Sequence, residues 1–532
     1  MKYDSVSGAN PVLHDRPGDR APRFSSILFP SASPGTPALS PAVPEFFRDL
    51  NLDQLVDTIA AQHKDYEIAP FFYAPLADAD EVRWRQDVMR DLERPGALAA
   101  VKAFSERIRY VRLCLPQEKK FYYRFQKERR LLEGADTYCG AVLKLRDDLR
   151  TLGPQSRGLA DLLEYLADYT GAAAFRALAD EARAARAALR SVRYGLLIDG
   201  DWVLVRRYED EQDYGALVER LFARFRRAAA KDYRLTFPPE PDMNHIEAQI
   251  LERVARLHPA PFADLMRFVA RHAAFVDERV ARFDREVQFY VAWLEHVARL
   301  RGAGLAFCYP QVERAPADVF ARGTFDVALA TRLAAEQRPV VANDFCLHGP
   351  ERVIVVSGPN QGGKTTFARS FGQLHYLAAL GCPVPGTGAR LHLFDQLFTH
   401  FERPEAIETL RGKLQDDLVR VHRILERATP DSIVILNEVF ASTTVGDALY
   451  LGTKIMERIH ALDLRCVCVT FLDELASFSE RTVSMVSQVD PADPALRTFR
   501  LERRPADGLA YAMAVADKRR VTYAWLMKRI AP

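Results

Sequence analysis

Apolar residues recur every three or four positions from residue 44 to about residue 300, the spacing typical of amphipathic helices. Stretches such as LNLDQLVDTIAAQ show the pattern clearly. It dominates residues 44–193 and 241–319, where we expect long α-helical arms. Between them, residues 194–210 change to strand-like runs on either side of Asp199-Gly200-Asp201, which is typical of a hairpin turn. We therefore place a small β-containing tip over residues 194–240.

After residue 320, short apolar runs alternate with helical patterns, and this predicts an α/β domain over residues 320–532. Residues 1–43 are rich in Pro, Ser and Gly and lack apolar periodicity. We interpret them as a disordered leader, with a docking tail as the alternative. The predicted fold class is a multi-domain chain of helical arms and a β-containing tip, followed by an α/β domain.

A glycine-rich loop follows the apolar run RVIVV and precedes the helical pattern TTFARSFGQLHYLAAL. Glycines let backbone N–H groups approach phosphates, and the start of a helix adds partial positive charge. Lys364 would contact the β- and γ-phosphates of a nucleotide, and Thr365 would offer its hydroxyl to Mg²⁺. The phosphate-binding pattern G-x-x-x-x-G-K-[ST] and its flanks comprise Gly358, Pro359, Asn360, Gln361, Gly362, Gly363, Lys364, Thr365 and Thr366.

A second apolar run, SIVILNEVF, ends in Asn437 and Glu438. If its strand is parallel to the one before the loop, both side chains reach the phosphates. Glu438 is the candidate base for the attacking water. Asn437 stands where an aspartate usually supports Mg²⁺, so we expect weaker metal binding. A third run, LRCVCVTF, ends at Phe471, which cannot hydrogen-bond to phosphate, and its Cys466 and Cys468 are expected to pack in a core rather than bind zinc.

Composition narrows the class of protein without naming a function. The chain has 532 residues, with 73 basic and 71 acidic side chains, so its charge neither demands nor excludes a polyanionic partner. No apolar run approaches the length of a membrane span, and the start of the chain lacks the pattern of a secretion signal. The seven scattered cysteines are typical of reduced thiols. We expect a cytoplasmic protein that does not enter a membrane.

The order of these motifs resembles the ATPase domain of MutS-type proteins, the mismatch-repair branch of the ABC class. GPNQGGKTT is similar to that family's GPNMGGKST loop. VVAND precedes the loop as in the family, and the segments CPVPG, LFTH, LNEVFASTTVGDAL and VTFLDEL follow in the family's order. The resemblance covers about residues 320–532, whereas over residues 44–319 it rests on the helical architecture.

This resemblance implies a site and an assembly. Residues 44–193 would be a helical core and lever, residues 241–319 returning lever helices, and residues 194–240 a clamp-like tip. The ATPase domain would bind ATP and Mg²⁺, with Thr365 and Asn437 near the metal and Val340 near the adenine. It would form a homodimer in which Asp447 faces the partner and a C-terminal helical segment closes the domain.

Contact with DNA, without sequence specificity, also follows from the resemblance. Basic stretches occupy residues 106–130 and 220–234, and the second lies at the expected tip. The alternative is that these arginine-rich helices are simply solvated faces. The tentative DNA contacts are Arg224, Arg226, Arg227 and Lys231.

The chain also departs from the family. The counterpart of its Ser-Thr signature is Arg411-Gly412-Lys413-Leu414-Gln415, which lacks that pair, and Val340 can pack on a base but not stack. We expect neither the mismatch-reading N-terminal domain nor an Smr domain. The favoured function is a slow ATPase that dimerises and uses ATP to control clamping on DNA in repair or recombination. The alternative is a nucleotide-gated interaction or scaffold protein with little or no hydrolysis and no mismatch recognition.

Overall fold

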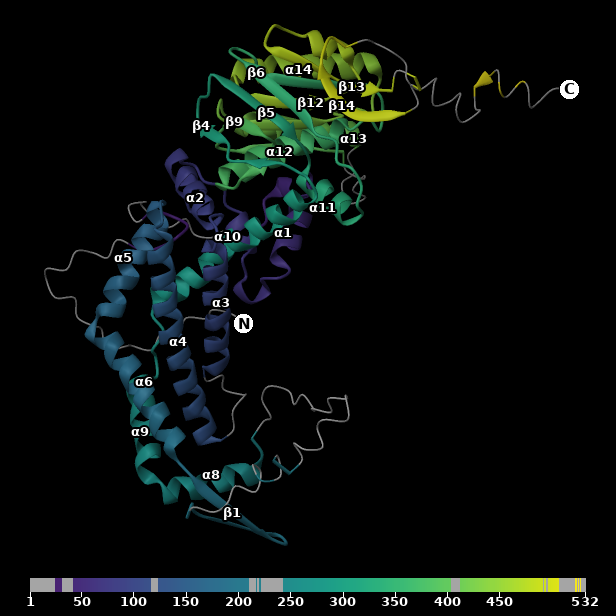
Figure 1. The fold of residues 1–532 in the computed structure, drawn as a ribbon. Coiled ribbons are helices and arrows are strands. Elements are labelled where there is room, and N and C mark those ends of the chain that lie inside the picture. Colours follow the sequence, from purple (N-terminus) through teal and green to yellow (C-terminus); the bar gives the residue numbers. More distant parts are fainter. Residues whose placement is uncertain are drawn as a thin grey trace. The chain divides into compact units, whose positions relative to one another are not determined.

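The chain divides into two compact units in the computed structural model (Figure 1). Unit 1 contains Met1–Pro95, Gln155–Leu159 and Arg285–Pro532, and unit 2 contains Gly96–Pro154 and Ala160–Asp284, so unit 2 is inserted into the sequence of unit 1. The structure describes residues 24–30, 42–115, 123–209, 217, 220–221, 243–402, 412–490, 492–493, 496–506, 522–523, 525 and 527.

The described part of unit 2 consists of long helices and one hairpin. Helix α3 lies close against α4 because Gly134 has no side chain: a Cβ there would lie 2.9 Å from Cys114 Cβ. The buried Tyr138 hydroxyl lies 3.0 Å from the Tyr169 hydroxyl and accepts a hydrogen bond from the backbone N–H of Asp277 at 3.1 Å. The elements are α3 (Ala97–Cys114), α4 (Arg124–Leu152), α5 (Arg157–Gly171), α6 (Ala173–Ser191), β1 (Tyr194–Asp199), β2 (Trp202–Arg207), α8 (His245–Leu257), α9 (Pro259–Arg271) and the start of α10 (Glu278–Gly302).

The expected hairpin is present. Strands β1 and β2 are antiparallel, and Asp199 pairs with Trp202 across a turn at Gly200 and Asp201. Gly200 has φ 55°, a conformation that favours glycine in such tight turns. The strand pattern within residues 194–210 therefore predicted this element correctly.

The main sheet of unit 1 has strand order β10-β11-β12-β7-β13-β14, and only β13 and β14 pair antiparallel. Its inner strands read as continuous apolar runs because helices cover both faces. Helices α13 and α14 pack on one face, whose buried core includes Cys466 and Cys468, and α12 packs on the other (Figure 1). Both cysteines are free, which agrees with the predicted packing role.

A second sheet, of order β4-β9-β5-β6, adjoins the first through Asn343 on β6. The Asn343 side chain donates to Phe499 O at 3.1 Å and accepts from Leu501 N at 2.7 Å, both on β14. The strands of unit 1 are β3 (Phe307–Cys308), β4 (Gln311–Glu313), β5 (Asp318–Thr324), β6 (Asn343–His348), β7 (Val353–Ser357), β8 (Val384–Pro385), β9 (Gly388–His392), β10 (Leu397–His400), β11 (Ile433–Asn437), β12 (Arg465–Val469), β13 (Thr482–Val489) and β14 (Arg497–Arg503).

The remaining described elements of unit 1 are helical. Within the described residues, none of the helices of either unit combines the length and apolar character that a bilayer span requires. The helical elements of unit 1 are η1 (Glu45–Phe47), α1 (Leu52–Ala60), η2 (Lys64–Tyr66), η3 (Ala69–Phe72), α2 (Ala79–Leu92), most of α10, α11 (Val327–Ala335), α12 (Lys364–Ala379), α13 (Lys413–Arg427), α14 (Val445–Leu462) and η4 (Asp473–Ser477).

The prediction of a disordered leader over residues 1–43 is wrong for residues 24–30. This segment lies buried in unit 1. Glu286 Oε2 accepts hydrogen bonds from Ser26 Oγ at 2.8 Å and Ile27 N at 3.0 Å. Ile27 O in turn accepts from Trp84 Nε1 and from the Tyr290 hydroxyl, both at 2.9 Å. Composition misled here because four buried apolar side chains are enough to dock a short segment in a Pro/Ser-rich stretch. These side chains are Phe24, Ile27, Leu28 and Phe29.

The compact units also differ from the domain boundaries expected at residues 193, 240 and 319. Residues 44–95 and 285–319 belong to the same unit as the α/β region, rather than to separate helical arms. The physical reason is burial: Tyr376 of α12 packs edge-on against Phe46 and Phe47, and its hydroxyl donates to Phe72 O at 2.8 Å. Helical periodicity alone does not reveal which partner a helix covers.

Candidate functional site

The glycine-rich loop connects the buried end of β7 to the first turn of α12. Gly358 and Gly363 have φ angles of 109° and 93°, which L side chains rarely adopt. Gly362 has no room for a side chain, because a Cβ there would lie 2.2 Å from Ser487 Oγ. The loop thus needs glycine at three positions, and its backbone lies close to β13.

Lys364 is the first residue of α12 and is 5% exposed. Its Nζ donates to Gly358 O at 2.8 Å and lies 3.4 Å from both Pro359 O and Asn360 Oδ1. Burial lowers the pKa of Lys364, and the nearby Glu438 carboxylate opposes that shift. The ammonium group is therefore held inside the loop by backbone oxygens.

Asn437 and Glu438 lie at the same edge of the sheet as the loop. The reason is that β11 and β7 are both parallel to β12, which lies between them. Thr365 Oγ1 donates to Asn437 Oδ1 at 2.9 Å, which joins two residues predicted to lie near a metal. Glu438 has φ 53°, and its backbone N–H donates to Val469 O at 2.9 Å. A non-glycine residue held in this conformation is a feature that often accompanies functional sites.

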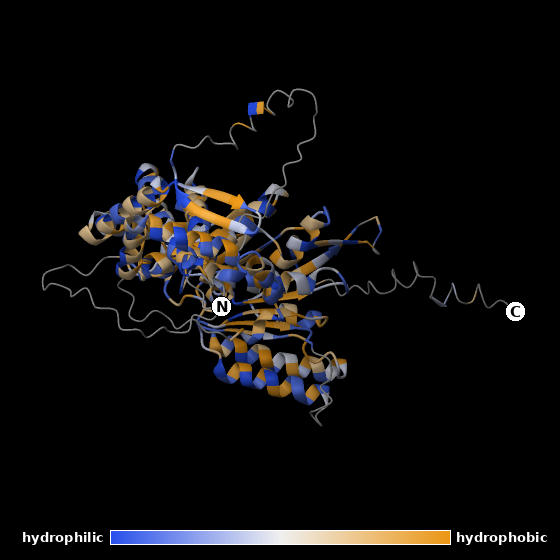
Figure 2. Cartoon of the chain, turned by 90° about the horizontal axis from the view of Figure 1, so that it is seen from below, coloured by the Kyte–Doolittle hydropathy of each residue, from blue (hydrophilic) through white to orange (hydrophobic). Residues whose placement is uncertain are grey.

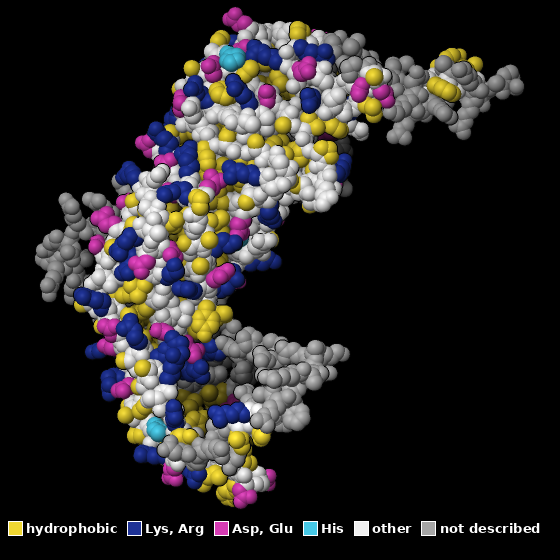
Figure 3. Space-filling view, in the orientation of Figure 1, with side chains coloured by type: hydrophobic (Ala, Val, Ile, Leu, Met, Phe, Trp, Pro, Cys, Tyr) yellow, Lys and Arg dark blue, Asp and Glu magenta, His cyan; other side chains and the backbone are white. Residues whose placement is uncertain are grey.

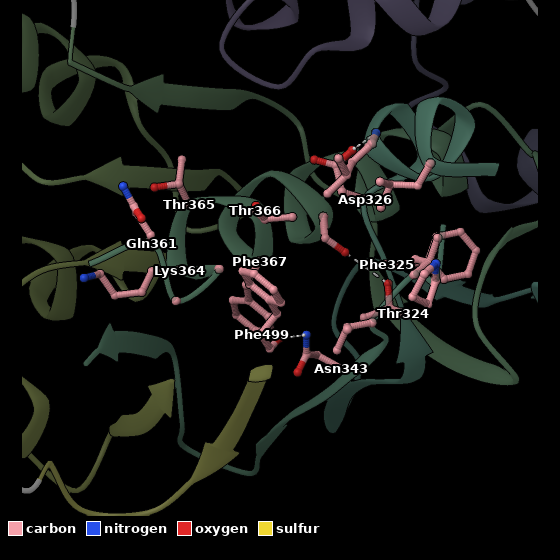
Figure 4. Close-up of a pocket in the computed structure, with 18 of the residues that line it drawn as sticks. Thr324, Phe325, Asp326, Asn343, Gln361, Lys364, Thr365, Thr366, Phe367 and Phe499 are labelled. Carbon is pink, nitrogen blue, oxygen red and sulfur yellow. Dashed lines mark hydrogen bonds between the residues drawn. The ribbon is translucent and has the colours of Figure 1, made fainter. Parts of the chain in front are cut away.

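A cavity of about 640 Å³ opens beside the loop within unit 1 (Figure 4). The loop, Glu438 and Val340 all line it. Asp326 lines it as well and is buried, and burial raises the pKa of its carboxyl group, which accepts hydrogen bonds from Leu329 N and Gln373 Nε2 at 2.9 Å. The structure brings the predicted phosphate loop, Val340 and Glu438 to one cavity.

Phe499 also lines this cavity and is absent from the prediction. It is 48% exposed and has φ 58°, and a Cβ on Gly363 would lie 3.6 Å from its backbone. Figure 4 shows its hydrogen bond to Asn343 beside the labelled loop residues. Local sequence gives no signal for Phe499, because only the pairing of β14 with β13 brings it to the loop.

Two further residues that the sequence does not mark hold the loop in place. Ser487 Oγ on β13 donates to Gly362 O at 2.6 Å, and Arg497 Nε on β14 donates to Asn360 O at 3.1 Å. Ser487 is fully buried. The run TVSMVSQV contains two serines, and nothing in it singles out Ser487 as the one that reaches the loop.

The residues predicted to face a partner subunit or the γ-phosphate lie at exposed positions. Asp447 is exposed near the start of α14, where its Oδ2 accepts from Thr444 Oγ1 at 2.8 Å. Phe471 is 47% exposed beyond the end of β12. Of the signature counterpart, Arg411 is outside the described residues, whereas Gly412 precedes α13 and Lys413 pairs with Glu402.

The predicted DNA contacts Arg224, Arg226, Arg227 and Lys231 lie outside the described residues. In the first basic stretch, 106–130, several described arginines already contact acidic groups. Arg112 pairs with the buried Asp284, and Arg124 and Arg129 pair with Glu128 and Glu133 one helical turn away. These pairs favour a solvated face for that stretch.

The described residues contain no group of three or more His, Cys, Asp or Glu side chains that could bind a metal ion. Thr365 and Asn437 offer a hydroxyl and an amide oxygen at the loop. Oxygen ligands of this kind fit Mg²⁺, which usually takes few protein ligands and completes its shell with substrate phosphates and water.

Comparison with known proteins gives a family for part of the chain. Residues 354–517 match the model of MutS domain V. Over 263 residues, the chain is 30% identical to the DNA mismatch repair protein MutS of Erythrobacter litoralis, covering 47% of this chain and 30% of that protein. The corresponding protein of Zymomonas mobilis is 33% identical over 198 residues, covering 36% and 23%.

A further relative is the endonuclease MutS2 of Gemmatimonas aurantiaca, 30% identical over 200 residues, which covers 37% of this chain and 24% of that protein. The chain therefore matches less than a third of the length of these relatives. The matched region contains the phosphate loop, β11 with Asn437, and Glu438. Over residues 354–517 the chain is therefore similar to MutS domain V.

Proposed function

We propose that the chain binds ATP in the cavity beside the glycine-rich loop, hydrolyses it slowly, and uses the bound nucleotide to control clamping on DNA. The observation that carries this proposal is that Lys364, Thr365 and Glu438 line one cavity of about 640 Å³, while Asn437 accepts a hydrogen bond from Thr365. A cavity of this size is in the range of ordinary ligand sites. The MutS domain V match over residues 354–517 supports the choice of nucleotide.

The phosphates are proposed to bind at the loop and the start of α12. Backbone N–H groups from Gly358 to Thr366 and the helix dipole would stabilise negative charge there. Lys364 already has its ammonium group among the loop oxygens. It would exchange these carbonyl contacts for charge-assisted contacts with the β- and γ-phosphates, which are stronger.

Mg²⁺ would be held by the Thr365 hydroxyl, with Asn437 supporting it, and would neutralise phosphate charge when bound. Glu438 would orient or deprotonate the attacking water. Its distinctive backbone conformation and its position after β11 support this role. Because Asn437 is uncharged, we expect metal binding to be weak and hydrolysis slow.

The adenine ring of ATP is proposed to lie between Val340 and Phe499, which both line the cavity. Val340 would pack on one side of the adenine. Phe499, with its exposed ring, would supply the aromatic face that Val340 lacks. This arrangement would compensate for the departure from the family at position 340.

DNA contact and dimerisation complete the proposal. The relatives from Erythrobacter litoralis and Zymomonas mobilis are named DNA mismatch repair proteins. By analogy, we propose backbone contact with DNA without sequence specificity, through Arg224, Arg226, Arg227 and Lys231, and an ATP-dependent homodimer in which Asp447 faces the partner. Binding carried by phosphate contacts must weaken as salt concentration rises.

Two measurements on the full chain test this function. Titration with ATP in the presence and absence of Mg²⁺ is expected to give saturable binding with slow release of phosphate. Titration with duplex and branched DNA is expected to give salt-sensitive binding that changes when ATP is added. Absence of ATP binding would overturn the nucleotide half of the proposal. Absence of DNA binding at low salt, with and without ATP, would overturn the DNA half.

Replacing Asn437 by aspartate is expected to strengthen Mg²⁺ binding. The substitution keeps the side-chain size and the oxygen that contacts Thr365, and it adds a negative charge beside the metal position. We expect the Mg²⁺ concentration needed for half-maximal ATP binding to fall by about tenfold, which corresponds to about 1.4 kcal/mol. A matched control is Gln311→Glu on exposed β4, outside the cavity lining, which adds the same charge and keeps the oxygen that accepts from Arg390 Nε. An unchanged Mg²⁺ dependence in Asn437→Asp would contradict the assigned metal position.

A second candidate function is a nucleotide-gated interaction protein with little turnover. Phe471 favours it, because the resemblance implies a polar side chain at this position to contact the γ-phosphate, and a phenyl ring cannot make that hydrogen bond. Binding alone can shift a conformational equilibrium when the bound state has different contacts. The Glu438 substitution described in the Discussion separates the two candidates.

A further inference from the structure

The β1–β2 hairpin of unit 2 exposes an unusual amount of apolar surface. Figure 2 draws its two strands largely in orange, and Figure 3 shows yellow and magenta side chains at the end where Figure 1 labels β1. Trp202 is 82% exposed, Ile198 74% and Leu204 59%. Contiguous exposed apolar patches on proteins usually mark interaction sites. The exposed large hydrophobic residues of the two strands are Tyr194, Leu196, Leu197, Ile198, Trp202, Val203 and Leu204.

Both faces of this ribbon are apolar at their centres. Successive side chains on a strand point to opposite faces, and directly paired residues share a face. One face, which we call the Trp202 face, carries Leu197 opposite Leu204 and Asp199 opposite Trp202. The other face carries Ile198 opposite Val203. A ribbon that functions alone in water would carry polar residues on one face, and an isolated two-stranded hairpin is only marginally stable.

Charge is ordered along the Trp202 face. Arg206 lies at the base of the hairpin, the Leu197–Leu204 pair lies in the middle, and Asp199 lies beside the turn. When a second copy of this face is laid on the first in the opposite direction, the Asp199 end of each copy lies on the Arg206 end of the other, where the two side chains are diagonal neighbours, and the leucines meet at the twofold axis. Laid in the same direction, aspartate would meet aspartate, which is unfavourable.

We propose that the Trp202 face is a self-association surface, which binds the same face of a second copy of this chain in antiparallel orientation. The face is self-complementary in both apolar pattern and charge, as a twofold interface requires. A membrane is the weaker alternative, because Asp199 and Asp201 at the turn would enter the bilayer first, and anionic headgroups would repel them. The contact does not depend on nucleotide.

The size of the hairpin predicts a weak contact. Stable protein interfaces bury about 1,200–2,000 Å² in total, half of it on each partner. One face of two six-residue strands buries less area than that half. We therefore expect association that appears only as protein concentration rises. A second contact elsewhere in the chain, such as the proposed nucleotide-dependent dimer, would strengthen it through effective concentration.

The test is sedimentation of the nucleotide-free full chain at concentrations up to about 0.1 mM, where weak self-association becomes measurable. Leu204→Lys places two like charges at the axis, and we expect at least a tenfold weaker association. Ile198→Lys is the matched control, since this side chain is more exposed than Leu204 but lies on the opposite face. Equal weakening by both variants, or no association of the unmodified chain, would overturn the proposal.

A charge exchange tests the orientation and guards against loss of the hairpin fold. Asp199→Arg and Arg206→Asp are each expected to weaken association, and the double variant is expected to restore it. A double variant as weak as the single ones would refute the antiparallel pairing. Sedimentation with anionic lipid vesicles completes the experiment: vesicle binding without self-association would also overturn the proposal.

Discussion

Replacing Lys364 by alanine is expected to weaken ATP binding by about two to four orders of magnitude, because two charge-assisted contacts worth about 1.5–3 kcal/mol each are lost. Lys364 is the buried cation of the glycine-rich loop, and its Nζ lies 2.8 Å from Gly358 O. Calorimetric titration with ATP measures the change.

The control for this substitution is Lys454→Ala, which removes an exposed lysine on α14 that pairs with Glu457 at 2.9 Å. It is expected to leave ATP affinity unchanged. The melting temperature of both variants should stay close to that of the unmodified chain, because Ser487 and Arg497 still hold the loop. Retention of full ATP affinity by Lys364→Ala would show that the phosphates bind elsewhere.

Replacing Glu438 by glutamine is expected to lower ATP turnover by about 10²–10⁴-fold while ATP binding persists. Glutamine keeps the shape of the side chain and its ability to hydrogen-bond, but it cannot accept the proton from water. The loss of the carboxylate also removes the charge that raises the pKa of Lys364, so the ammonium group is slightly less favoured in the variant. Phosphate release under single-turnover conditions is the appropriate measurement.

Glu457→Gln on the exposed face of α14 is the matched control and is expected to keep normal turnover. If the unmodified chain hydrolyses ATP slowly and Glu438→Gln abolishes that activity, Glu438 is the base. If turnover is near background in both, with binding intact, the nucleotide-gated interaction protein becomes the better description.

The phosphate loop was predictable because its determinants are contiguous. Three glycines, a lysine and a threonine lie between an apolar run and a helical pattern, and the chemistry of phosphate binding fixes their order. Asn437 and Glu438 were predictable for a related reason. Parallel strands deliver their carboxyl ends to one edge of a sheet, and the Thr365–Asn437 contact at 2.9 Å agrees with that reasoning.

The supports of the loop were not predictable in this way. Ser487, Arg497 and Phe499 reach the loop through strands β13 and β14, more than a hundred residues further along the chain. Their positions depend on which strand lies beside β7, and no local pattern encodes that neighbour. Segment 24–30 escaped prediction for a different reason, since its apolar residues are few and surrounded by residues typical of disorder.

Burial of segment 24–30 has a consequence for the order in which the chain folds during synthesis. The segment is made early, but its hydrogen-bond partner Glu286 lies 260 residues later, so a very long loop must close before it can dock. Unit 2 is complete once Asp284 has been made, whereas unit 1 still awaits its central strands. We expect the inserted unit to fold first, and segment 24–30 to dock only after residues 285 and beyond have been made.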